Sequence, residues 1–151
     1  MTYIISYKKH ITQERTVEIR LPLIDAEFVG TELATVDGVT YISLPDGVAL
    51  SLDQPEEVAS TVINPVEIDG GLKADIKNAS PHCRLISQRM LDQIRAAYSI
   101  DDEMYFARIG VGAATGMYVP TEGEMQELTV FGEFVEAVRQ WGRDERAALG
   151  V

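Results

Sequence analysis

The sequence has few of the residues on which thiol, histidine and metal chemistry depend. Its 151 residues include one cysteine, Cys83, and two histidines, His10 and His82. A single cysteine cannot form a disulfide within the chain, and no spacing of His, Cys or acidic residues matches a metal-binding motif. We therefore expect no cofactor and no metal ion, and a reducing compartment is the simplest environment for the protein.

Positive charge and long apolar runs are also scarce. Lysine and arginine number 13 against 24 acidic residues, which gives a net charge of −11. Nucleic acids and anionic membranes would repel such a chain, and no run approaches the ~18 apolar residues needed to span a bilayer. The first ten residues carry their positive charges after a short apolar run, the reverse of a secretory signal. We expect a protein that is cytoplasmic or virion-associated, with protein partners rather than nucleic acid or membrane.

What the chain does contain is enough apolar material to fold, with 46% hydrophobic and 25% charged residues. Short strand-like runs occupy the first half, at 3–7, 15–21, 31–36, 40–44, 48–52 and 58–68. Asp37-Gly38 and Pro45-Asp46-Gly47 separate three of these runs, and Asp-Gly favours tight hairpin turns. The pattern predicts a three-stranded meander over residues 31–52. Pro65 indicates an edge, a bulge or a break in the last run.

From residue 79 the apolar spacing becomes helical. Ser80 is a good N-cap and Pro81 suits the first helical position, so a helix is predicted from there to about Tyr98. Its apolar stripe has spacings of three, four, four and three, formed by Cys83, Ile86, Met90, Ile94 and Ala97.

Two further helices are predicted. Ser99 and Asp102 resemble a capping box that opens a helix over 100–109, whose inner face would consist of Ile100, Met104 and Ala107. The glycines at 110, 112 and 116 predict a loop over 110–120. Thr121 and Glu124 then open a third helix, to about residue 147, with an apolar stripe formed by Leu128, Phe131, Phe134, Val135, Val138 and Trp141.

The predicted fold class is therefore α+β: an N-terminal antiparallel β-meander of about five to six short strands, followed by a C-terminal cluster of three helices. Residues 1–78 form the β-rich region and 79–151 the helical region, with 69–79 as the junction. Whether the two regions share one compact domain is left open by the sequence.

Cys83 is the candidate for catalysis. A thiol in the first turn of a helix has its pKa lowered by the helix dipole, which favours the nucleophilic thiolate. His82, however, points about 100° away on the helix and is poorly aimed to act as its base. Cys83 also lies on the apolar stripe, where a free cysteine behaves as a small hydrophobic residue. The core role is the preferred interpretation, and a thiol nucleophile is the alternative.

Two other patterns have ordinary structural explanations. The segment Gly110 to Gly116 resembles a phosphate-binding loop, but the helix that should follow and the lysine of such loops are missing. We interpret it as a surface loop that contacts a partner. The acidic residues at 101–103 and 122–127 fall in predicted first helical turns, where they complement the helix dipole.

The C-terminal part of the sequence resembles small accessory proteins encoded among phage and prophage tail genes. The matching residues are Arg95, Tyr98 and Ser99, then Asp101 to Met104, then Phe134-Val135-Glu136, Trp141, Arg143 and the final Ala-Leu-Gly. This resemblance implies a structural or assembly role and no catalytic residues.

The sequence thus favours a non-enzymatic structural or assembly protein, associated with a phage or prophage tail. Its candidate contact residues are Phe131, Phe134, Trp141, Gly110, Gly112, Gly116 and Tyr118. Self-association through the aromatic face of the third helix is expected from the breadth of that face. The alternatives are a small hydrolase or transferase that uses Cys83, and a regulatory module that binds small anions near the start of the first helix.

Overall fold

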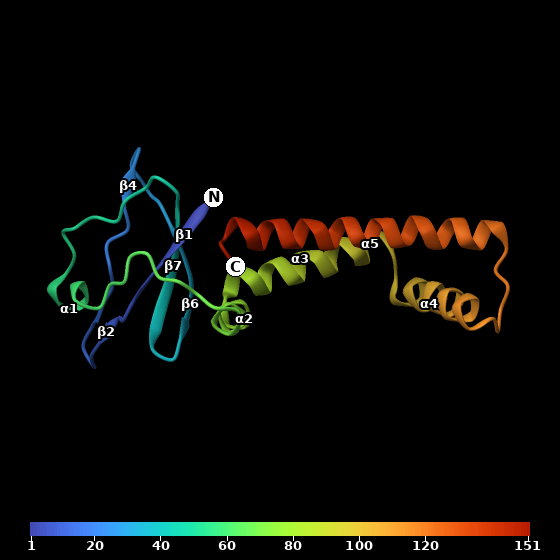
Figure 1. Cartoon of the computed structure of the whole chain (residues 1–151), viewed down its shortest axis with the longest axis horizontal. Coiled ribbons are helices and arrows are strands. Elements are labelled where there is room, and N and C mark those ends of the chain that lie inside the picture. The colour runs from blue at the N-terminus through green and yellow to red at the C-terminus, as the bar shows by residue number, and fades with distance from the viewer. The chain divides into compact units, whose positions relative to one another are not determined.

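A computed structural model describes the whole chain, Met1–Val151, and its fold class is α+β as predicted (Figure 1). The chain forms two compact units. Unit 1 contains Met1–Leu85 and Glu145–Val151, and unit 2 contains Ile86–Asp144. The division falls inside a helix after Leu85, whereas the sequence placed the change of structure at residues 78 and 79. The segment 145–151, predicted as part of the helical region, belongs to the unit that holds the strands.

Unit 1 is built on a three-stranded antiparallel sheet in the order β1 (Thr2–Tyr7), β7 (Val39–Pro45), β6 (Thr31–Val36). The predicted hairpin between β6 and β7 is confirmed. Asp37 and Gly38 adopt φ values of 50° and 79°, the left-handed conformation that tight hairpins require.

The prediction of a third meander strand after Gly47 is wrong. Residues 48–52 form no strand, and β1 pairs with β7 instead, with Ile5 opposite Ile42. Four of the six residues of β1 are buried beside β7, whereas only Leu50 is buried in the segment 48–52, so the burial of β1 favours this pairing. A hydrogen bond from the Asp46 amide to the Met1 carbonyl, 3.0 Å long, closes this edge of the sheet.

Two small hairpins and an irregular segment complete the strands of unit 1. β2 (His10–Ile11) pairs with β3 (Thr16–Val17), and β4 (Leu23–Ile24) pairs with β5 (Glu27–Phe28), which makes seven strands in all. The predicted strand over 58–68 is wrong. It contains the end of the short helix α1 (Glu56–Ala59), a two-way hydrogen-bonded bridge between Ile63 and Ser6, and a cis peptide bond before Pro65.

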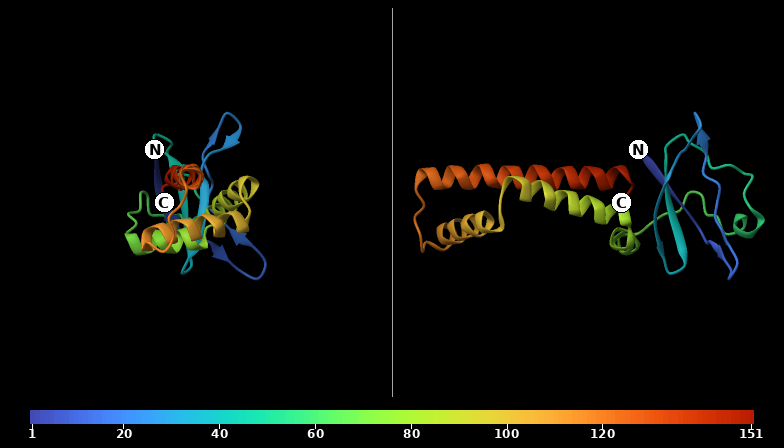
Figure 2. Two further views of the ribbon diagram at one scale, coloured as in Figure 1. Left: turned by 90° about the vertical axis from the view of Figure 1, so that its right-hand side faces the viewer. Right: turned by 180° about the vertical axis from the view of Figure 1, so that it is seen from behind.

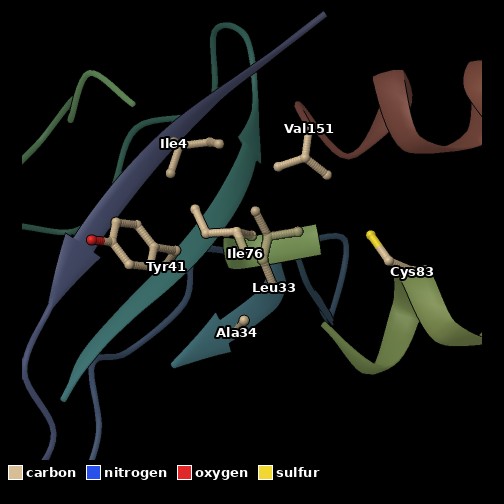
Figure 3. Close-up of a cluster of buried hydrophobic side chains, with 7 residues drawn as sticks. All are labelled: Ile4, Leu33, Ala34, Tyr41, Ile76, Cys83 and Val151. Atoms are coloured by element: carbon tan, nitrogen blue, oxygen red, sulfur yellow. The ribbon is translucent and has the colours of Figure 1, made fainter. Parts of the chain in front are cut away.

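The sheet separates two apolar cores because successive side chains of a strand point to opposite faces. The first core contains Ile4, Leu33, Ala34, Tyr41, Ile76, Cys83 and Val151 (Figure 3). The second core contains Ile5, Tyr7, Ile19, Ile42, Leu44, Leu50 and Val58. Ile4 and Ile5 are adjacent in β1 yet belong to different cores, so a shift of β1 by one residue would disrupt both.

The first core is closed by α2 (Gly70–Ala79), a helix that lies in the segment predicted to be the junction. Asp69 caps it by accepting a 2.8 Å hydrogen bond from the Leu72 amide, and Ile76 is completely buried. Capping and burial together outweigh the two glycines at its start. After Ser80 the chain continues into α3 (Pro81–Ala97), which begins and ends where the sequence predicts.

The last two helices are α4 (Ile100–Thr115) and α5 (Glu122–Ala148), which lie side by side in unit 2 (Figure 1, Figure 2). Both capping boxes are confirmed: Asp102 donates its amide to the Ser99 hydroxyl at 3.0 Å, and Glu124 donates its amide to Thr121 Oγ1 at 3.1 Å. The predicted loop over 110–120 is wrong in its first half. Helix α4 continues through Gly110 and Gly112 and ends at Gly116, whose φ of 71° is left-handed.

The inner face of α4 also differs from the prediction. Phe106 and Ile109 are buried, whereas Ile100, Met104 and Ala107 are exposed. Phe106 stacks on Phe131 of α5 with a ring-centroid distance of 4.6 Å, and this contact turns the other face of α4 outward. The stripe predicted for α5 is confirmed as its less exposed face, with Val138 fully in the interior.

Candidate functional site

Cys83 lies in the first core of unit 1 and is only 3% exposed. Its sulfur points from α3 toward the other side chains of that core (Figure 3). The Cys83 amide is 3.4 Å from the hydroxyl of Ser80, a residue that is itself completely buried. The adjacent His82 is exposed. A substrate could therefore reach the thiol only if this end of α3 opened.

The start of α3 was also the suggested location for small anions. The Ser80 hydroxyl accepts a hydrogen bond from the Cys83 amide, so one of the free backbone amides at this helix end already has a partner. Ser80 is buried, and the next two residues, Pro81 and His82, are exposed. The neighbouring charged side chain, Arg84, is exposed as well.

The aromatic candidates of α5 make contacts inside unit 2. Phe131 and Phe134 both meet the Tyr98 ring edge-on, with centroid distances of 4.9 and 5.5 Å. Tyr98 also contacts Phe106, at 5.9 Å. Trp141 is partly buried. These rings join α3, α4 and α5, so most of the aromatic surface that the sequence offered for self-association is used within one chain.

The glycine candidates and Tyr118 come together at the turn between α4 and α5. A Cβ on Gly112 would lie 2.8 Å from the Cβ of Tyr118, so only glycine fits there without a shift of the turn. The Tyr118 amide donates to the Gly112 carbonyl at 3.1 Å, and its hydroxyl donates to the Glu124 carboxylate at 2.8 Å. That hydrogen bond raises the pKa of Tyr118, with burial as the second cause.

The segment from Gly110 to Gly116 is therefore the end of α4 and its left-handed C-cap, and the predicted loop is wrong there. Gly110 brings α4 close to α5, since a Cβ there would already contact Leu128 at 3.9 Å. A pocket of about 330 Å³ lies beside the turn, lined by Tyr105, Arg108, Ile109, Tyr118 and Glu124.

A second surface of unit 2 was not among the predicted contact residues. Ile100, Met104 and Val111 are 60%, 52% and 63% exposed, and Ala107 lies exposed between them. We call these four residues the outer stripe of α4. Beyond the end of the helix, Met117 and Val119 are also exposed. The spacing of Ile100, Met104 and Ala107 is visible in the sequence and predicts an inner face, but the structure buries the competing face with Phe106 and Ile109 instead.

Unit 1 carries its own exposed apolar surface. The β4–β5 hairpin exposes Leu23 and Phe28, which line a pocket of about 620 Å³ with Ile19, Arg20, Leu21, Pro22, Ser51 and Asp53. Arg20 and Asp53 form an ion pair of 3.1 Å at its edge.

One charge cluster, made of a largely covered amine and two half-exposed carboxylates, lies near the β2–β3 hairpin. The Lys9 amine is 3.0 Å from a Glu18 oxygen and 2.6 Å from a Glu32 oxygen. Burial lowers the pKa of Lys9, but the hydrogen bonds and charges of the two carboxylates outweigh it, so the net pKa is raised and the amine stays protonated. Burial also raises the pKa of Tyr7 nearby. Since all three charged groups satisfy one another, we interpret the cluster as structural.

Neither unit presents an assembled centre for metal chemistry, because no three His, Cys, Asp or Glu side chains are grouped so that they could hold an ion. None of the helices combines the length and apolar character that crossing a bilayer requires. No family model, curated protein or solved structure matches this chain.

Proposed function

We propose that the protein is a non-enzymatic structural or assembly protein, associated with a phage or prophage tail, that works through contacts with other proteins. The observation that carries this proposal is the outer stripe of α4 together with Met117 and Val119. Scattered apolar residues are normal on a protein surface, but several exposed apolar residues on one side of a helix indicate a contact region. The tail association comes from the resemblance of the C-terminal sequence to tail-region accessory proteins.

The position of Cys83 also supports a role without catalysis. A nucleophile must be exposed and held as a thiolate by a nearby base or positive charge. Cys83 instead packs among Leu33, Ile76 and Val151. The thiol-dependent hydrolase or transferase remains the alternative proposal, and it requires that this core opens during turnover.

Deletion of the gene in the source strain tests the role in tails. We expect fewer complete tails in electron micrographs and fewer infectious particles, and we expect normal numbers when the gene is restored. Antibody against the protein should detect it in purified particles if it is a structural part, or only in assembly intermediates if it assists assembly. Normal tails after deletion, with no protein in either fraction, would refute the proposal.

Substitution of Cys83 separates this proposal from the thiol enzyme. Cys83→Ala and Cys83→Ser both remove the nucleophile, while Ala keeps the apolar character of the core. Tail yields should be restored by Cys83→Ala at normal protein level, measured by immunoblot. Loss of function in both variants, with folding and protein level unchanged, would favour the enzyme. Fast thiol labelling of the native protein near pH 6 would point the same way.

A further inference from the structure

We propose that α4 pairs with α4 of a second copy of this chain, as an antiparallel pair of helices in contact through the outer stripe. This inference rests on the proposed function, since it names one partner for a protein that acts by contact. The surface belongs wholly to unit 2.

The outer stripe has the spacing of a coiled-coil seam. Ile100, Met104, Ala107 and Val111 follow one another at intervals of four, three and four residues, which places them on one narrow side of the helix. The buried residues Phe106 and Ile109 lie on the opposite side, against the aromatic residues of unit 2. The stripe therefore faces away from the packed side of α4, and its three large side chains are each more than half exposed.

An antiparallel pair with its twofold axis between Met104 and Ala107 matches large residues with smaller ones. Ile100 then lies opposite Val111 of the second copy, and Met104 lies opposite Ala107 of the second copy. Each match occurs twice because of the symmetry. The small side chain of Ala107 leaves room for Met104, whose flexible thioether fills irregular spaces.

Charges beside the stripe favour this orientation. Asp101 and Arg108 lie on the same flank, seven residues apart, and both are exposed. Neither makes an ion pair or hydrogen bond within its own chain. In the antiparallel pair, Asp101 of each copy meets Arg108 of the other, which forms two ion pairs across the contact.

The flank of α4 that carries Glu103 and Gly110 places no like charges against each other in the antiparallel pair. Glu103 already pairs with Arg95 of its own chain at 2.7 Å, and across the twofold it would face the uncharged Gly110. A parallel pair would instead leave Asp101 without a cation, bring Arg108 near a Glu103 that already pairs with Arg95, and align the two helix dipoles unfavourably. The charges on α4 therefore select the antiparallel arrangement.

The length of the stripe predicts the strength of the pair. From Ile100 to Val111 a helix advances about 16 Å, which is short for an interface between proteins. We therefore expect a dimer in reversible exchange with monomer, with a dissociation constant in the micromolar range or weaker.

Sedimentation equilibrium over a wide concentration range tests the pairing. Met104→Glu places a charge in both central layers and should raise the dissociation constant about 100-fold or more. Val130→Glu is the matched control, since Val130 is 53% exposed on α5 and lies outside the stripe. It should leave the dissociation constant unchanged.

A charge exchange tests the orientation. Arg108→Asp should weaken the dimer about tenfold, because two attractions become repulsions. Adding Asp101→Arg to the same chain should restore most of the loss, which happens only if these two positions face each other across an antiparallel contact. Far-ultraviolet circular dichroism confirms that the variants stay helical.

The pairing is refuted if the wild-type protein is monomeric at about millimolar concentration, or if Met104→Glu and Val130→Glu behave alike. The antiparallel arrangement is refuted if the double exchange fails to restore the dimer. If the protein is monomeric and still supports tail formation, only the proposed pairing is refuted. If the protein dimerises but deletion of its gene leaves tails normal, only the proposed function is refuted.

Discussion

Gly142 in α5 provides a direct test of how α3 and α5 pack in unit 2. The residue is buried, and a Cβ built on it would press on the thioether sulfur of Met90 and lie 3.0 Å from its Cε and 3.2 Å from its Cγ. Gly132, on the same helix, has no atom within 4 Å of the equivalent position. The two glycines therefore differ in packing but share the helical backbone.

Replacement by alanine should separate these two effects. In a helix interior, Gly→Ala stabilises by about 0.5–1 kcal/mol, so Gly132→Ala should raise the free energy of unfolding by that amount. At Gly142 the same gain is opposed by overpacking against Met90, which costs about 1–3 kcal/mol. Gly142→Ala should therefore be less stable than the wild type by about 1 kcal/mol, and about 2 kcal/mol less stable than Gly132→Ala.

Urea unfolding followed by the helical circular dichroism signal measures both values. A double-mutant cycle with Met90→Ala tests whether contact with Met90 causes the loss of stability. In the Met90→Ala background, Gly142→Ala should become stabilising. If Gly142→Ala is as stabilising as Gly132→Ala in the otherwise native protein, the close approach of α3 and α5 at this residue is not present and the reasoning fails.

Three further predictions concern the core, the cap of α4 and the charge cluster. Leu33→Ala, at a completely buried residue of the first core, should lower the free energy of unfolding by about 3 kcal/mol in urea titrations, and a loss below about 1 kcal/mol would contradict the packing. The backbone amide and then the side chain of Ser99 hold the pKa of Asp102 below its usual range, so this cap stabilises α4 above the unfolded pKa and loses its effect as the pH falls through the folded pKa. Thermal unfolding should therefore be less sensitive to acid in Asp102→Asn than in the wild type, and equal sensitivity would remove the assignment. Lys9→Ala leaves two carboxylates without their shared cation, which should cost about 1 kcal/mol at neutral pH, and thermal scans that show no change would count against the cluster.

The parts of the fold that the sequence predicts well are those set by neighbouring residues. Asp37-Gly38 adopts the left-handed turn that its chemistry favours, and the hairpin follows from it. Ser80 and Thr121 mark the starts of α3 and α5 because cap residues act within one turn of the helix. Such signals need no knowledge of the rest of the chain.

The errors arise where distant residues decide. The partner of β7 is β1, which precedes it by some thirty residues and outcompetes the adjacent segment through burial. Helix α2 begins with two glycines, and it is stable because the Asp69 cap is joined by the docking of Ile76 into the first core. The local sequence contains no sign of that docking.

Helix α4 shows the same limit at the candidate contact surface. Its sequence carries two apolar faces, one with Met104 and one with Phe106, and either could have been interior. The aromatic rings of Tyr98 and Phe131 select Phe106, which leaves Met104 outside. Periodicity is compatible with either face and cannot rank them, because the choice depends on helices that lie elsewhere in the sequence.

The return of residues 145–151 to unit 1 has a consequence for how the protein is made. Val151 is buried in the first core with Ile4, and the backbone of Gly150 lies close to Thr2. During synthesis, the strands emerge from the ribosome long before the segment that completes their core. Unit 2 is a continuous stretch of chain and can assemble first, while Ile4 and Leu33 stay incompletely covered. The nascent chain should thus depend on chaperones, and proteolysis or mutation near residue 145 should harm the strands at the opposite end of the sequence.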